Sequence, residues 1–170
     1  AYEISVRDWS SDVCSSDLFL FYDRVTRIEK GKRIVGIKSL SSSEAFLEKH
    51  FTKIALIPGT LLIEAMAQLL GWLVAYSHDF RYMAIMSLIG GARLPPALKP
   101  GVRLEVDGHL VTNTERDSLG MATASLNGEV VARVDRLIFR HFAVPNPEPL
   151  VTRFLYYGGI EDLAALERQR

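Results

Sequence analysis

One apolar segment limits what this chain can fold into more than any other feature. Residues 61–76 read LLIEAMAQLLGWLVAY and follow a Pro58-Gly59 break. Leu, Ala, Met and Gln are good helix formers, so the segment predicts a long helix. Glu64 and Gln68 are the only polar side chains in its first ten residues. A helix that is apolar on every side must be enclosed, either by the rest of the protein or by lipid.

The membrane alternative is disfavoured by the same segment. The Pro-Gly break, the glutamate and the glutamine leave an uninterrupted apolar run shorter than the roughly 20 residues that a membrane span needs. A chain of 170 residues can bury such a helix in its own core without disulfides or metals. We therefore predict a core helix and no membrane span.

Short β-type segments flank the predicted helix. Two are expected on either side of Lys30-Gly31, and Asn127-Gly128 predicts a type I′ hairpin turn. Gly90-Gly91 predicts a bulge or a close backbone approach. Four longer strands are expected over residues 82–94, 102–115, 119–126 and 129–140. About five or six antiparallel strands that fold around one apolar helix give an α+β hot-dog fold.

The two ends of the chain differ from its middle. Residues 1–18 contain DWSSDVCSSDL, which matches the translation of a common short-read sequencing adapter, so we expect them not to be native. Residues 19–144 are expected to form the folded domain. Residues 145–170 are expected to form a linker, PNPEP, and a short peripheral helix, IEDLAALERQR. Cys14, the only cysteine, lies in the suspect leader.

Composition excludes several classes of function. Hydrophobic residues make up 48% of the chain, charged residues 24%, and the formal net charge is zero. The chain has no block of Lys and Arg, so no nucleic-acid partner is expected. With no cysteine outside the leader, disulfides, thiolate nucleophiles and cysteine-bound metals are not expected, and no His cluster has metal-ligand spacing.

The polar residues around the helix form a candidate active site. Glu64 and Gln68 are four apart, so the amide can hydrogen-bond the carboxylate. Gly59 places a backbone N–H near the positive end of the helix dipole, which suits a carbonyl oxygen that gains negative charge. His50 precedes the helix by a loop that can fold back. Base, acid and oxyanion donor together suit proton abstraction next to a carbonyl.

The segment from His50 to Gln68 resembles a motif of a known family. HF…IPGTLLIEAMAQ is similar to the signature of the 3-hydroxyacyl-acyl carrier protein dehydratases, HFPG…PG(V/T)L…EA(M/L)AQ. The spacing of fourteen from His50 to Glu64, and of five from Gly59 to Glu64, agrees with that signature. FLFYDRV resembles the family's FLLVDRV, and GGARLPPALKPG resembles its ARFxxPVxPGD.

The resemblance implies a role for each matching residue. His50 would remove the α-proton of a (3R)-3-hydroxyacyl thioester, and Glu64 would protonate the leaving β-hydroxyl. Gly59 N–H would polarise the thioester carbonyl. Gln68 would hold Glu64, and the carbonyl of Leu56 would orient the imidazole.

The resemblance also implies partners and a location. The substrate would arrive on the phosphopantetheine of acyl carrier protein, with no separate cofactor and no metal. The protein would be cytoplasmic and form a homodimer with shared active sites, which could assemble into a trimer of dimers. The pathway served would be fatty-acid, polyene or polyketide synthesis.

The loop around His50 departs from the family. Lys49 replaces the glycine before the histidine, and Thr52-Lys53 replaces the Pro-Gly that follows HF. Lys49 and Lys53 either contact the carrier protein or the phosphopantetheine, or are simply solvated. Two other functions therefore stay open: a hot-dog thioesterase, and an acyl-carrier-binding module without catalytic activity.

Overall fold

The computed structural model describes residues 20–47 and 54–161, which form one α+β domain. Its six strands make one antiparallel sheet in the order β1-β2-β4-β5-β6-β3. The elements, in chain order, are β1 Arg24–Glu29, β2 Arg33–Leu40, the 3-10 turn η3 Ala45–Leu47, α1 Gly59–Ser77, β3 Tyr82–Arg93, β4 Val102–Asn113, β5 Asp117–Leu126, β6 Glu129–Ala143 and α2 Glu148–Gly158.

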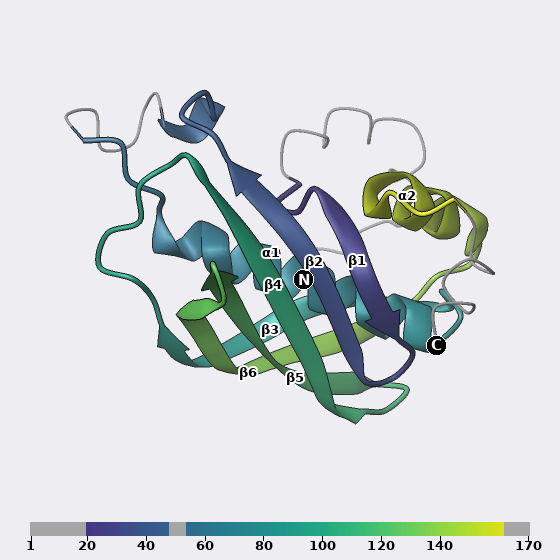
Figure 1. Ribbon diagram of the computed structural model, residues 1–170. Coiled ribbons are helices and arrows are strands. Elements are labelled where there is room, and N and C mark those ends of the chain that lie inside the picture. The colour runs from purple at the N-terminus through teal and green to yellow at the C-terminus, as the bar shows by residue number, and fades with distance from the viewer. Residues whose placement is uncertain (1–19, 48–53, 162–170) are drawn as a thin grey trace, which may run out of the picture.

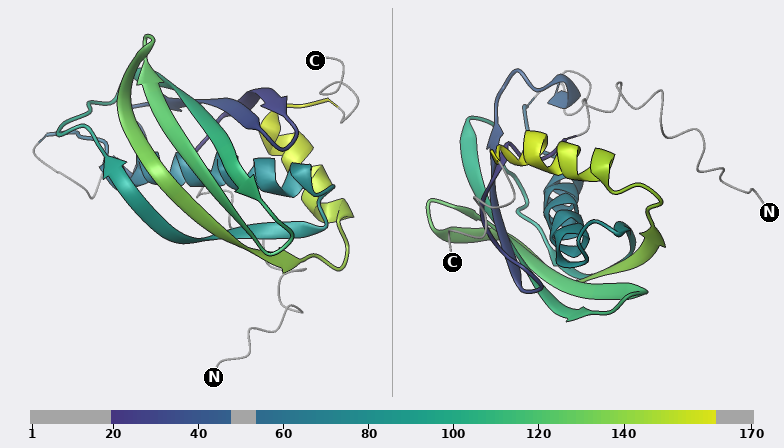
Figure 2. Two further views of the ribbon diagram at one scale, coloured as in Figure 1. Left: turned by 90° about the horizontal axis from the view of Figure 1, so that it is seen from below. Right: turned by 90° about the vertical axis from the view of Figure 1, so that its right-hand side faces the viewer.

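The sheet curves around α1, as the hot-dog prediction requires. The end-on view shows α1 inside the curve of the sheet, with α2 crossing another side of it (Figure 2, right). Most of α1 is buried, including Met66, Leu69 and Leu70, which have no exposed surface. By length and composition α1 could cross a membrane, but 56% of its apolar window is buried in the fold. It is therefore a core helix, as predicted.

Glycines on the inner strands let α1 approach the sheet closely. A Cβ on Gly36 of β2 would lie 2.9 Å from the Leu69 side chain, and a Cβ on Gly108 or Gly120 would lie 3.0 Å from Leu70. Real Cβ atoms are almost never found as close as 2.9 Å. The strands β2, β4 and β5 are adjacent in the sheet, so their glycines together leave space for the two leucine side chains of α1 (Figure 1).

The turn predicted at Asn127-Gly128 is confirmed. At Gly90-Gly91 there is a close approach but no bulge. Asn127 and Gly128 both have positive φ, 53° and 85°, as a type I′ turn requires. The irregularity in the β3–β6 pairing lies between Met86 and Leu88, not at Gly90-Gly91. The glycine pair instead allows side chains of β6 to come close: a Cβ on Gly91 would lie 2.8 Å from Asp135 Oδ2.

The C-terminal region differs from the sequence-based expectation. The expected linker, residues 145–149, overlaps the start of α2, whose first residue is Glu148. Helix α2 was not expected from the sequence, and Phe154 on it is fully buried against α1. In the eleven residues of α2 only Phe154 and Gly158 are buried. So few buried positions give a weak helical period in the sequence, and the helix was not recognised. The helix expected over residues 160–170 lies almost wholly outside the described residues.

Candidate active site

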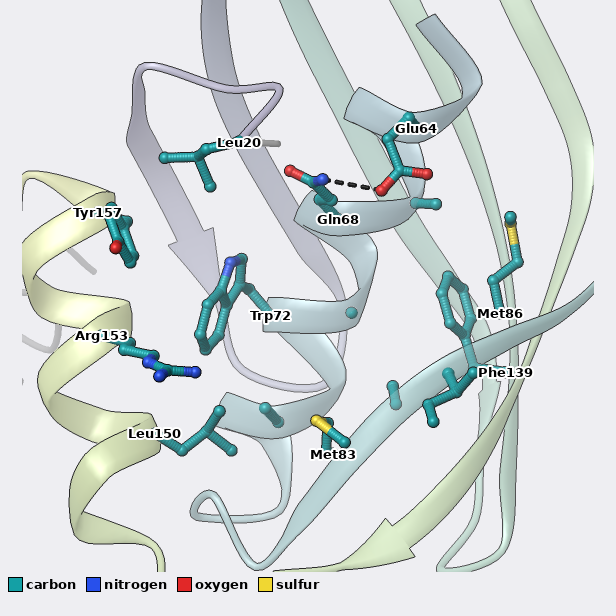
Figure 3. A pocket seen from close by; sticks show the side chains of 15 residues that line it. Leu20, Glu64, Gln68, Trp72, Met83, Met86, Phe139, Leu150, Arg153 and Tyr157 are labelled. Carbon is teal, nitrogen blue, oxygen red and sulfur yellow. Dashed lines mark hydrogen bonds between the residues drawn. The ribbon is translucent and has the colours of Figure 1, made fainter. Parts of the chain in front are cut away.

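A cavity of about 480 Å³ runs along one face of α1. This size is typical of pockets for small molecules and acyl chains. Its walls come from α1, β3, β6, α2 and the segment before β1 (Figure 3). The lining residues are Leu20, Glu64, Ala67, Gln68, Gly71, Trp72, Ala75, Met83, Ala84, Ile85, Met86, Phe139, Leu150, Arg153 and Tyr157.

Glu64 and Gln68 lie together at one end of this cavity. The Gln68 amide donates a hydrogen bond of 2.8 Å from Nε2 to Glu64 Oε1, as their spacing predicts. The other end of the amide is also fixed, because Phe21 N–H donates to Gln68 Oε1 at 2.9 Å. An amide whose oxygen already accepts a hydrogen bond must present its NH₂ group to the carboxylate. The segment before β1 therefore sets the orientation of Gln68, and Gln68 that of Glu64.

Gly59 begins α1, directly after Pro58. The first N–H groups of a helix have no acceptor within the helix, so the Gly59 N–H can bind a ligand. A Cβ on Gly59 would lie 2.9 Å from Leu94 Cδ1, so a larger residue here would require the Leu94 side chain to move. Leu94, which replaces the phenylalanine of the family motif, thus packs over the start of the helix, and it is absent from the lining of the cavity.

Part of the predicted site falls outside the described residues. His50, Lys49 and Lys53 all lie in residues 48–53, so their predicted roles stay predictions. Leu56 is described and is half-buried in the segment that leads to α1. Its carbonyl was predicted to orient the His50 ring, which the described residues do not test.

Of the fifteen residues that line the cavity, only Glu64 and Gln68 were predicted as site residues; Trp72 and Arg153 are the most informative of the others. Trp72 is half-buried and lines the cavity, whereas Met66 and Leu69 of the same helix are fully buried. Arg153 comes from α2 and lines the same cavity. Trp72 could have been found from helix periodicity, since positions 64, 68, 72 and 75 share one face. Arg153 carried no such signal, because its helix was not expected.

The comparison with known families agrees with this geometry. The FabA-like domain family matches residues 14–135, which is more than half of the chain. The chain belongs to the FabA-like family. Its curated relatives include 3-hydroxyacyl-[acyl-carrier-protein] dehydratase FabZ of Geobacillus thermodenitrificans, which is 33% identical over 118 residues, or 69% of this chain and 81% of that protein. The FabZ dehydratase of Bacillus subtilis is 31% identical over 69% of this chain and 84% of its own length.

Solved structures share the fold of this FabA-like chain. The dehydratase heterocomplex ApeI:P from Xenorhabdus doucetiae matches with a TM-score of 0.58 at 19% identity, over 81% of this chain and 90% of that chain. Protein smu.793 from Streptococcus mutans, bound to acetyl CoA, matches with a TM-score of 0.56 at 15% identity, over 72% and 90% of the two chains. The hot-dog fold predicted from the sequence is therefore confirmed, as is the dehydratase family.

Proposed function

We propose that this protein removes water from (3R)-3-hydroxyacyl-acyl carrier protein and gives trans-2-enoyl-acyl carrier protein. One observation carries the proposal: in a member of the FabA-like family, Gln68 holds Glu64 at the end of an apolar cavity large enough for an acyl chain. The protein is thus a hydro-lyase of fatty-acid or related polyene and polyketide synthesis.

The reaction divides between two side chains and one backbone group. His50 takes the α-proton, and the electron pair left on the α-carbon forms the new double bond as the β-hydroxyl leaves. Glu64 gives a proton to that hydroxyl, which departs as water. Gly59 N–H stabilises the negative charge that develops on the thioester oxygen. A general acid or base typically raises the rate by about 10²–10⁴-fold. One oxyanion donor raises it by about 10²–10³-fold.

The substrate reaches the site on acyl carrier protein, whose phosphopantetheine carries the acyl chain, so no separate cofactor and no metal is required. Lys49 and Lys53 flank the proposed base and provide positive charge for the phosphate of that arm or for the acidic carrier. With this reaction we propose that the protein acts on acyl carrier protein, needs no further cofactor and is cytoplasmic.

We further propose a homodimer in which His50 of one subunit and Glu64 of the other share each site, with a trimer of dimers as a larger assembly. The open edge of the sheet supports this arrangement. Ile85, Leu88 and Ile89 on the edge strand β3 are 45%, 47% and 42% exposed. An apolar edge of this length is typical of a surface that pairs with another strand.

The decisive experiment compares the wild-type protein with His50→Ala and Glu64→Gln on a (3R)-3-hydroxyacyl-acyl carrier protein. Mass spectrometry of the acyl arm should show loss of water in the wild type and a turnover lowered by at least about 10²-fold in each variant. Release of free thiol without enoyl product would identify a thioesterase instead. Substrate binding without any product would identify a non-catalytic module.

A further inference from the structure

Helix α2 supplies a wall of the cavity that the family match does not include. The match ends at residue 135, whereas α2 spans Glu148–Gly158. Leu150, Arg153 and Tyr157 lie three and four residues apart, so they occupy one face of α2, and all three line the cavity. The far wall of the cavity thus lies outside the segment that the family match covers.

Aromatic packing holds this wall against α1. The Phe154 ring has no exposed surface, and its centroid lies 5.4 Å from that of Trp72 and 5.3 Å from that of Phe80. Tyr76 stacks on the same ring at 5.9 Å. The three rings that contact Phe154 come from successive positions along the last part of α1 and the residues just after it. Helix α2 therefore cannot shift along α1 without losing these contacts. The residues beside Phe154 therefore have fixed positions relative to the cavity.

Among the described residues that line the cavity, Arg153 is the only cation. Figure 3 shows its guanidinium group turned from α2 towards α1, between Trp72 and Leu150. The side chain is half-buried, and within the described part of the chain it makes no hydrogen bond or ion pair. A guanidinium group has five donors and no acceptor, so its natural complement is an oxygen acceptor.

The other charged group of the cavity is too far along the helix to serve as that complement. Glu64 and Trp72 are eight residues apart on α1, which corresponds to about 12 Å along the helix axis. Figure 3 places Glu64 at the opposite end of the cavity from Arg153. Apart from Glu64, Gln68, Arg153 and Tyr157, the described side chains that line the cavity are apolar or aromatic. An acyl chain with its β-carbon at Glu64 would extend its far end towards Arg153.

We propose that Arg153 is a specificity-determining residue that binds an oxygen atom at the far end of the acyl chain, so that the enzyme prefers chains ending in a carboxylate or hydroxyl over chains ending in methyl. This inference rests on the proposed dehydration, since Glu64 fixes which end of the chain reaches Arg153. The apolar middle of the cavity accepts the methylene groups, and the guanidinium group binds the terminal oxygen.

The test uses three 3-hydroxyacyl thioesters of equal length that end in methyl, hydroxyl or carboxylate. The wild type should show kcat/KM about tenfold or more higher for the oxygenated chains, the size expected of a charge-assisted hydrogen bond. Arg153→Met should abolish or reverse that preference, while Arg153→Lys should keep it for the carboxylate. Tyr156→Leu is a matched control on α2, because Tyr156 is 78% exposed and absent from the cavity lining.

Dissociation constants of the same three thioesters, measured by calorimetry, separate this inference from the proposed function. The oxygenated chains could bind more tightly in an Arg153-dependent way although no chain is dehydrated. That result would refute the proposed dehydration and support the contact between Arg153 and the terminal oxygen. A wild type that favours the methyl-ended chain overturns the inference, as does an Arg153→Met variant that keeps the wild-type ratio. Circular dichroism establishes that each variant is folded.

Discussion

At the scale of single residues, the site depends on one carboxylate kept in an otherwise apolar helix. An unpaired polar group there would be costly, and Gln68 removes that cost by donating to Glu64. The backbone N–H of Phe21 in turn fixes the Gln68 amide. The spacing of four predicted the first of these bonds. The second joins positions 47 residues apart, so no local pattern could predict it.

The role of the Gly59 N–H can be tested with a pair of variants that differ in little else. Pro58 has ψ of 127°, a conformation that tolerates a following proline, and proline is well accepted at the first helical position. Gly59→Pro removes the N–H, whereas Gly59→Ala keeps it, and both add a Cβ beside Leu94. We expect kcat of the proline variant to be about 10²–10³-fold below that of the alanine variant.

Steady-state kinetics on a 3-hydroxyacyl thioester measures this difference, and thermal unfolding of both variants provides the control for stability. Equal kcat values in two equally stable variants would show that Gly59 is not the oxyanion donor.

At the scale of elements, a polar cluster joins the end of α1 to three strands. His78, which caps α1, bonds Asn113 Oδ1 of β4 through Nε2 at 3.0 Å. Ser118 of β5 donates to the same oxygen at 2.6 Å. Its single hydrogen is then used, so His141 Nε2 on β6, 2.8 Å away, must donate to Ser118 Oγ. The cluster stabilises the end of the sheet away from Gly59.

This cluster makes stability depend on pH. Burial, and next the neighbouring His78, lower the pKa of His141 below its ordinary value of 6.5. As the pH falls through about 6.5, the unfolded chain therefore binds a proton at this position before the folded chain does, and the free energy of unfolding falls. His141→Gln, which keeps an Nε2 donor for Ser118, should reduce this loss. Urea unfolding at about pH 7.5 and pH 5.5 measures the effect, and a variant with the wild-type pH dependence would contradict it.

At the scale of the whole molecule, the two edges of the sheet differ. The β1 edge carries charged residues, Arg24, Arg27 and Glu29, which discourage pairing with another strand. The β3 edge exposes isoleucine and leucine instead. For the homodimer proposed above, this difference favours pairing along β3 over pairing along β1.

A charge on the apolar edge tests this assembly. We expect Leu88→Lys to convert the proposed dimer into monomers and to lower turnover strongly, because each site would lose its partner's histidine. Val111→Lys is the control, since Val111 is 56% exposed but lies on β4 in the interior of the sheet. Light scattering gives the mass of each variant. A wild type that is monomeric and fully active would refute the shared site.

Much of the architecture could be predicted from the sequence because it depends on local patterns. The apolar run of residues 61–76 predicted α1, and alternation with Asn127-Gly128 predicted the strands and their turn. The spacing of Gly59, Glu64 and Gln68 placed three groups on the start of one helix. Each of these features lies within a few residues, where the 3.6-residue and two-residue periods act directly.

The sequence by itself therefore determined the hot-dog fold, the family and the pairing of Glu64 with Gln68. Only the tertiary structure decided what surrounds them: that α2 packs on α1 through Phe154, that Trp72 lines a cavity, and that Arg153 reaches its far end. The physical reason is distance along the chain. Arg153 and Trp72 are 81 positions apart, and they meet because burial of one aromatic side chain fixes the place of a whole helix.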